Sequence, residues 1–94
     1  MSAQLSIVRV APNPDSPAAR ASRLYAEAQA AALEQVRVLG TSLEQVIALA
    51  AEIAEGGEVY PAGVRDLCRR LSEDLSSRAQ TLDVLAQRAL DRTH

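Results

Sequence analysis

The sequence has one cysteine, Cys68, and one histidine, His94, which are residue types that often supply a nucleophile or a general base. Cys68 lies at an apolar position of a helical pattern, where a packed thiol is expected rather than a nucleophile. His94 is the last residue, where a side chain is expected to be untethered and without a catalytic or phosphotransfer role. We therefore expect no catalytic residue.

Metal and cofactor chemistry also lacks a pattern in this sequence. No histidine and carboxylate pair stands at the spacing of metal ligands, and a single cysteine excludes a thiolate cluster. Gly56 and Gly57 lack the flanking strand and the further glycines of a phosphate-binding loop, so a helix C-cap accounts for them. The sequence predicts no metal site, no cofactor and no small-molecule substrate, and hence a protein that is not an enzyme.

The densest charged segment is VRDLCRRLSEDLSSR, residues 64–78. Asp66 precedes Arg70 by four residues, and Asp74 precedes Arg78 by four, an arrangement that favours ion pairs along an exposed helix. A solvated helix face is the main interpretation. The alternative is contact with an acidic partner or nucleic acid near a predicted hairpin tip, through four residues: Tyr60, Arg65, Arg69 and Arg70.

The composition limits the kinds of partner. The formal charge is only −2, so no overall basic surface for nucleic acid or for an acidic membrane is predicted. The two tyrosines are the only aromatic residues, which disfavours modules that stack bases on rings. We expect nucleic-acid binding to be unlikely and membrane binding to be absent.

Several features bear on where the protein works. The first ten residues lack the basic start and apolar run of a signal peptide, and no apolar stretch reaches membrane-spanning length. A lone cysteine suits a reducing compartment. All ten basic residues are arginine, which suggests the codon usage of a GC-rich bacterial genome. We expect a bacterial cytoplasmic protein.

Residues 1–16 read as an N-terminal arm. The segment QLSIVRV, residues 4–10, alternates apolar and polar positions like a short strand, yet no second strand is predicted to pair with it. It is either a poorly ordered tail or a strand that pairs with another chain. The proline-rich segment APNPDSP follows, and Asp15 or Ser16 is expected to cap a helix that starts at Pro17.

Two helices are expected in the remaining domain, residues 17–94. Strong helix formers run from about 17 to 55 and again from about 61 to 92. Between them lies EGGEVY, where glycine supplies a left-handed cap and Tyr60 precedes the Pro61 that starts the second helix. So short a connection makes the helices antiparallel neighbours. The predicted fold class is all-α, a long antiparallel helical hairpin.

Gly40, followed by Thr41 and Ser42, leaves one alternative open, a three-helix bundle with a break at Gly40. Glycine often ends a helix, and Thr41 followed by Glu44 fits a capping box. The apolar register, however, runs through the glycine without a shift, at spacings of three and four residues that include Val36, Leu39, Leu43, Val46, Ala50 and Ile53. Periodicity therefore favours one continuous helix.

The second helix has a similar predicted seam, with Arg78 as its one polar member. The seam consists of Val64, Cys68, Leu71, Leu75, Arg78, Leu82, Leu85 and Ala89, with Ala79 and Ala86 beside it. Arg78 is expected to direct its charge outward along the seam or to pair with Asp74 one turn earlier.

More apolar surface remains than one hairpin can bury. Two hairpins packed as a four-helix bundle would cover it, so a homodimer is expected. The predicted oligomer or partner interface consists of Tyr25, Ala28, Ala32, Leu33, Ile47, Ala54, Leu67, Val84 and Leu90. The sequence thus predicts a non-enzymatic helical interaction, scaffold or regulatory module that acts as a homo-oligomer and binds a protein partner. The alternative is a small DNA-associated regulator that uses the N-terminal strand or the arginines near the tip.

Overall fold

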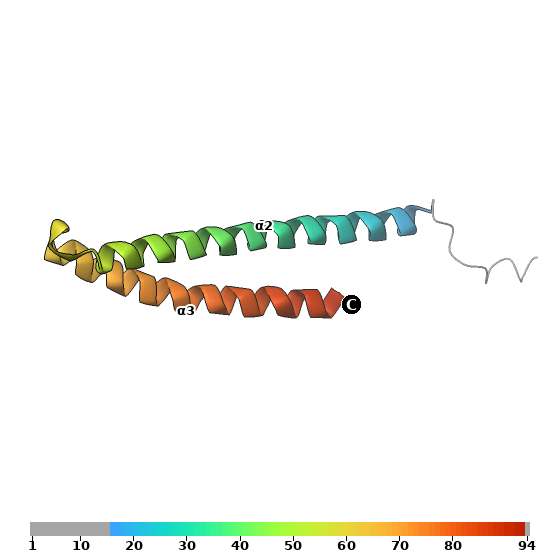
Figure 1. The fold of residues 1–94 in the computed structure, drawn as a ribbon. Coiled ribbons are helices and arrows are strands. Elements are labelled where there is room, and N and C mark those ends of the chain that lie inside the picture. The colour runs from blue at the N-terminus through green and yellow to red at the C-terminus, as the bar shows by residue number, and fades with distance from the viewer. Residues whose placement is uncertain (1–15, 94) are drawn as a thin grey trace, which may run out of the picture. The chain divides into compact units, whose positions relative to one another are not determined.

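The computed structural model describes residues 16–93 and is all-helical over that range (Figure 1). Helix α2 spans Pro17–Ala54, a short 3₁₀ helix η1 spans Gly57–Val59, and helix α3 spans Ala62–Thr93. The predicted helical hairpin is confirmed, with helix ends within one residue of the expected ones. The strand predicted at residues 4–10 and most of the arm at 1–16 lie outside the described residues.

The chain divides into two compact units, one up to Ala32 and one from Leu33 onward. In the second unit, residues 33–54 of α2 and helix α3 run side by side in opposite directions, joined by the turn that contains η1 (Figure 1). In the first unit, residues 17–32 form the amino-terminal part of α2. Leu24 and Tyr25 in this part are each about two-thirds exposed to solvent.

Ser16 caps the start of α2, as predicted. Its Oγ accepts a hydrogen bond from the backbone N–H of Ala19 at 3.0 Å, and its carbonyl accepts one from Arg20 at 2.9 Å. Pro17 occupies the first helical position. Proline lacks a backbone N–H, and at this position that group would have no partner within the helix. These contacts satisfy amide groups that the first turn of every helix leaves unpaired.

Helix α2 continues through Gly40 without a break. The Thr41 hydroxyl donates a hydrogen bond to the backbone carbonyl of Arg37 at 3.2 Å, so it bonds back into its own helix and does not cap a new one. The three-helix alternative is therefore wrong. A capping motif in the sequence has been overridden here by the packing of a continuous apolar register.

The hairpin turn closes through backbone hydrogen bonds and one left-handed glycine. The amide of Gly56 donates to the carbonyl of Ile53, and the amide of Tyr60 donates to the carbonyl of Gly57, both at 3.1 Å. Gly57 has φ of +78°, a conformation that costs a residue with a side chain about 1–2 kcal/mol. Helix α3 then begins when the amide of Arg65 donates to the carbonyl of Pro61.

One stripe on each helix makes the contact between α2 and α3, and we call these residues the inner stripe. All of its members are buried or half-buried, and they recur at alternating spacings of three and four. On α2 they are Leu33, Val36, Gly40, Leu43, Ile47, Ala50 and Ala54, and on α3 they are Cys68, Ser72, Leu75, Ala79, Leu82, Ala86 and Ala89.

The inner stripe is rotated by one heptad position from the predicted seams. Leu39 and Val46 of the predicted α2 seam are about half exposed, and their places are taken by Gly40 and Ile47. In α3, Leu71 and Leu85 turn outward in the same way. On α3 residue size is the physical reason, since Ser72, Ala79 and Ala86 let a neighbouring helix backbone approach more closely than leucine or arginine would, whereas on α2 the substituted positions include the larger Ile47 in place of Val46.

Two glycine substitutions should shift stability in opposite directions. A Cβ added at Gly40 would meet no atom within 4 Å, and the backbone there is helical, so Gly40→Ala should stabilise the protein by about 1 kcal/mol. Gly57→Ala also meets no atom within 4 Å but requires a positive φ, so it should destabilise by about 1 kcal/mol or more. Thermal unfolding followed by circular dichroism measures both, and equal effects would contradict the explanation.

Candidate interaction surfaces

One face of the hairpin carries exposed aliphatic side chains, and we call it the apolar flank. Each member is between 42% and 58% exposed, although leucine and valine are usually buried. Its members are Leu39, Val46 and Leu49 on α2, and Val64, Leu67, Leu71 and Leu85 on α3. Single leucines scattered over a protein surface need no explanation, but several exposed aliphatic side chains on both helices make this face a candidate interaction surface.

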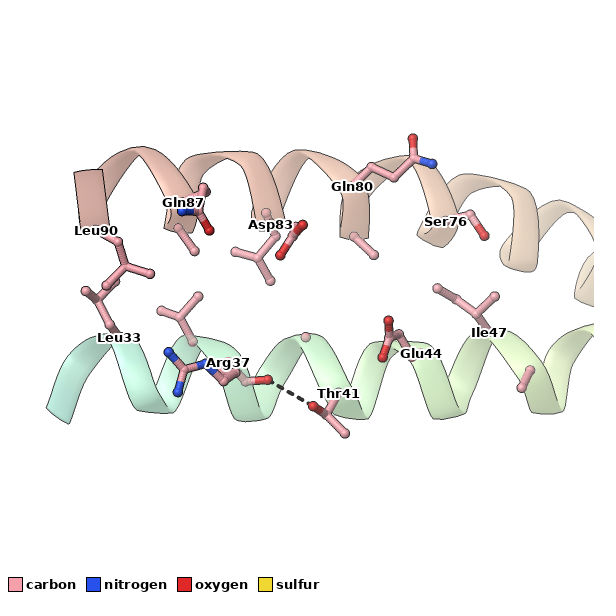
Figure 2. Close-up of a pocket in the computed structure, with 16 residues that line it drawn as sticks. Leu33, Arg37, Thr41, Glu44, Ile47, Ser76, Gln80, Asp83, Gln87 and Leu90 are labelled. Carbon is pink, nitrogen blue, oxygen red and sulfur yellow. Dashed lines mark hydrogen bonds between the residues drawn. The ribbon is translucent and has the colours of Figure 1, made fainter. Parts of the chain in front are cut away.

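A groove of about 650 Å³ lies between the two helices, and we call it the interhelical groove (Figure 2). Its floor comes from the inner stripe and includes Leu33, Val36, Gly40, Ile47, Ala79, Leu82 and Ala86. Its walls are mostly polar and come from Arg37, Thr41, Glu44 and Ala48 on α2, and Ser76, Gln80, Asp83, Gln87 and Leu90 on α3. The groove thus combines an apolar floor with polar walls.

The apolar flank and the interhelical groove open on opposite faces of the hairpin. At 3.6 residues per turn, Leu39 and Val46 project to one side of the inner stripe of α2, whereas Arg37 and Glu44 project to the other. On α3, Leu71 and Leu85 lie on one side of the stripe, and Asp83 and its neighbours in the groove wall lie on the other. The groove is lined by Arg37, Glu44 and Asp83 from the two helices. The leucines and the valine named above therefore lie together on the opposite face.

Two carboxylates in the groove walls have no ionic partner within the described part of the chain. Arg37 pairs with Glu34 at 2.6 Å, one turn earlier on α2. Among the described residues, however, neither Glu44 nor Asp83 makes an ion pair or a side-chain hydrogen bond. Figure 2 shows Asp83 extending from α3 toward α2, with Glu44 on the facing wall. The middle of the groove is therefore acidic.

The residues singled out at the hairpin tip all make contacts within their own hairpin. The Tyr60 ring covers Gly56, where an added Cβ would collide with the ring atoms Cδ2 and Cε2. Arg65 donates from Nε to the carbonyl of Tyr60 at 3.2 Å, and Arg69 reaches the carbonyl of Ala54 at 3.5 Å. These contacts tie the start of α3 to the turn and to the end of α2.

The predicted ion pairs of α3 are present. Arg70 contacts Asp66 at 2.8 Å, and Arg69 lies 3.8 Å from the same carboxyl group. Arg78 pairs with Asp74 at 3.1 Å and is exposed, so it is no misfit in the helix contact; one heptad from both Leu71 and Leu85, it has the same position on α3 as those members of the apolar flank. All these side chains are more than half exposed, and pairs of this kind contribute only a few tenths of a kcal/mol.

The nine residues predicted as an oligomer or partner interface fall into four groups. Tyr25, Ala28 and Ala32 are exposed in the amino-terminal part of α2, and Leu67 lies on the apolar flank. Val84 is about half exposed on the side of α3 turned away from α2. The remaining four lie between the two helices: Ala54 is buried, and Leu33, Ile47 and Leu90 are half-buried and line the interhelical groove.

Sequence reasoning did not identify the two unpaired carboxylates or the main members of the apolar flank. Periodicity places Leu39, Leu71 and Leu85 in the contact between the helices, and so it does not predict them on a surface. A usable signal was present in α3, because small residues recur every seven positions beside its seam, at Ser72, Ala79 and Ala86. Small residues at that spacing indicate where two helices approach most closely.

The structure describes Cys68 and most of the side chains that could bind a metal, but it does not describe His94. Cys68 is half-buried on the inner stripe, as a packed thiol would be, and His94 lies outside the described residues. Within residues 16–93, no three metal-ligating side chains come together. None of the described helices has both the length and the apolar character that crossing a bilayer requires.

Comparison with protein-family models, with curated protein sequences and with solved structures gives no significant match for this chain.

The contact between Tyr60 and Gly56 predicts a coupled pair of substitutions. Gly56→Ala should destabilise the hairpin by about 1–3 kcal/mol, because its methyl group overlaps the tyrosine ring. In a Tyr60→Ala background the same substitution should cost much less, since the overlapping ring is gone. Urea denaturation of the two single variants and the double variant measures the coupling energy. Additive effects would show that the ring does not pack on Gly56 in solution.

Proposed function

We propose that this chain is a non-enzymatic helical interaction module that acts as a homo-oligomer, with a second hairpin packed against its apolar flank. The observation that carries the proposal is the set of half-exposed leucines and valines on one face of both helices. In water these side chains lose the free energy that burial would give them, at roughly 25 cal/mol per Å².

The size of the apolar flank supports a second copy as its occupant. With about half of seven aliphatic side chains in water, the flank exposes on the order of 600 Å², at the top of the range for a monomer. A stable interface buries about 800 Å² on each partner. Atoms of the residues around the flank would supply the rest of the buried area. Packing flank to flank would produce the antiparallel four-helix bundle that the sequence predicts.

The sequence of the amino-terminal part of α2 repeats the heptad positions of the apolar flank. Tyr25 and Ala32 are separated from Leu39 by two heptads and by one, and Ala28 is separated from Leu49 by three. They therefore occupy the same heptad positions as the α2 members of the apolar flank. All three are exposed. This shared register supports their assignment to a homo-oligomer interface.

Two charged substitutions on the apolar flank should separate the oligomer into monomers. Leu39→Glu and Leu71→Glu each place a carboxylate among aliphatic side chains that the proposed interface would bury. The mass measured by light scattering after gel filtration should fall to that of a single 10.0 kDa chain.

The matched control is Val59→Glu. Val59 is 85% exposed and lies in η1, outside both helices and outside the apolar flank. The control variant should keep the mass of the unmodified protein. A wild-type protein that is monomeric, or a Val59→Glu variant that dissociates as readily as Leu39→Glu, would refute self-association through the flank.

A further inference from the structure

We infer that the interhelical groove is a docking site for a basic, small-residue α-helix of a different protein. The inference deepens the proposed interaction role by giving the partner a chemical class, and it does not depend on self-association. The groove lies within one hairpin, on the face opposite the apolar flank, so self-association through the flank would leave it open.

Gly40 is the first reason for a docked helix. A glycine inside a helix costs about 1 kcal/mol relative to alanine. Neither usual requirement for glycine applies here, since the backbone is helical and an added Cβ would meet nothing within 4 Å. The missing side chain instead leaves the groove floor open at a point where another backbone can approach closely.

The charges of the groove walls define the partner's chemistry. Glu44 and Asp83 face the groove from opposite walls and are unpaired among the described residues, while the nearby Arg37 is already paired with Glu34. A cationic side chain on a docked helix would gain two partners without breaking an existing ion pair. Charge complementarity therefore favours arginine or lysine on the incoming helix and disfavours aspartate or glutamate.

The spacing of the two carboxylates defines the partner's pattern. Figure 2 shows Leu33 facing Leu90 and Ile47 facing Ser76, which places Asp83 opposite the region of Gly40, about one turn from Glu44. Basic residues four positions apart on the docked helix would match this separation. The groove is lined from Leu33 to Ala48 along α2, a length that suits a partner helix of about four turns.

A peptide pair tests the inference on the full chain. One probe is an alanine-rich helical peptide of about 16 residues with two arginines four positions apart, and the other carries glutamates at those two positions. Fluorescence anisotropy should show saturable binding of the arginine peptide and at least about tenfold weaker binding of the glutamate peptide. Equal binding of the two peptides, or no saturable binding of the arginine peptide, would overturn the inference.

Variants locate the binding in the groove. Gly40→Leu fills the floor, and the double variant Glu44→Gln with Asp83→Asn removes the wall charges; each should weaken binding of the arginine peptide by about tenfold or more. The matched controls are Gln45→Leu, and Glu27→Gln combined with Glu52→Gln. These substitutions change exposed residues outside the groove lining and should leave binding unchanged. Equal effects of variants and controls would overturn the inference.

Two further measurements separate loss of groove binding from loss of helical structure and from a change in self-association. Circular dichroism should show unchanged helix content in Gly40→Leu, so that loss of binding reports on the groove. The Leu39→Glu variant should still bind the arginine peptide, whether or not it changes the oligomeric mass. If Gly40→Leu itself lowers the oligomeric mass, the groove is occupied by a second copy, and the assignment to a different protein is overturned.

Discussion

Packing of small residues between the two helices, tightest where Ala50 and Ala54 are buried beside the turn, is the constraint on which the rest of this structure depends. The chain has no phenylalanine or tryptophan to fill a wide interior. Glycine, alanine and serine occupy about half of the inner stripe, and leucine, isoleucine and valine occupy most of the remainder. A thin contact of this kind gains its stability from many short-range contacts along its length. No single large side chain anchors it.

The exposed surface follows from that choice of contact. Because small residues take the positions between the helices, larger residues such as Leu39 and Leu71 turn to one side and form the apolar flank. The other side carries polar residues and the groove. The groove floor includes the small residues Gly40, Ala79 and Ala86 for the same reason. The two faces of the hairpin therefore differ sharply in chemistry, although both follow from which residues lie between the two helices.

The elements of the fold were predictable because local signals and periodicity agreed. Ser16 and Pro17 marked the start of α2, and the paired glycines marked its end. Where signals conflicted, at Gly40 and Thr41, the continuous apolar register correctly outweighed the capping motif, and the Thr41 hydroxyl bonds within the helix.

The rotation of the helices about their own axes was not predictable from periodicity alone. A seven-residue repeat fits two neighbouring pairs of positions equally well, and the choice between them depends on how closely the backbones approach. Leu71 and Ser72 illustrate the difference, since hydrophobicity favours Leu71 as an interior residue, whereas the smaller Ser72 takes the half-buried position. The groove and its two unpaired carboxylates depend on this choice, so they emerge only from the three-dimensional structure.

The heptad register of the inner stripe also makes the length of the hairpin modular. Each helix repeats the same kind of contact every seven residues, and the turn from Gly56 to Pro61 is held by its own hydrogen bonds. Removing one heptad from each helix would shorten both arms equally and leave the turn and the remaining contacts in phase. Insertions of matched heptads would lengthen them in the same way. Evolution or design can thus adjust the reach of this protein without redesigning its core.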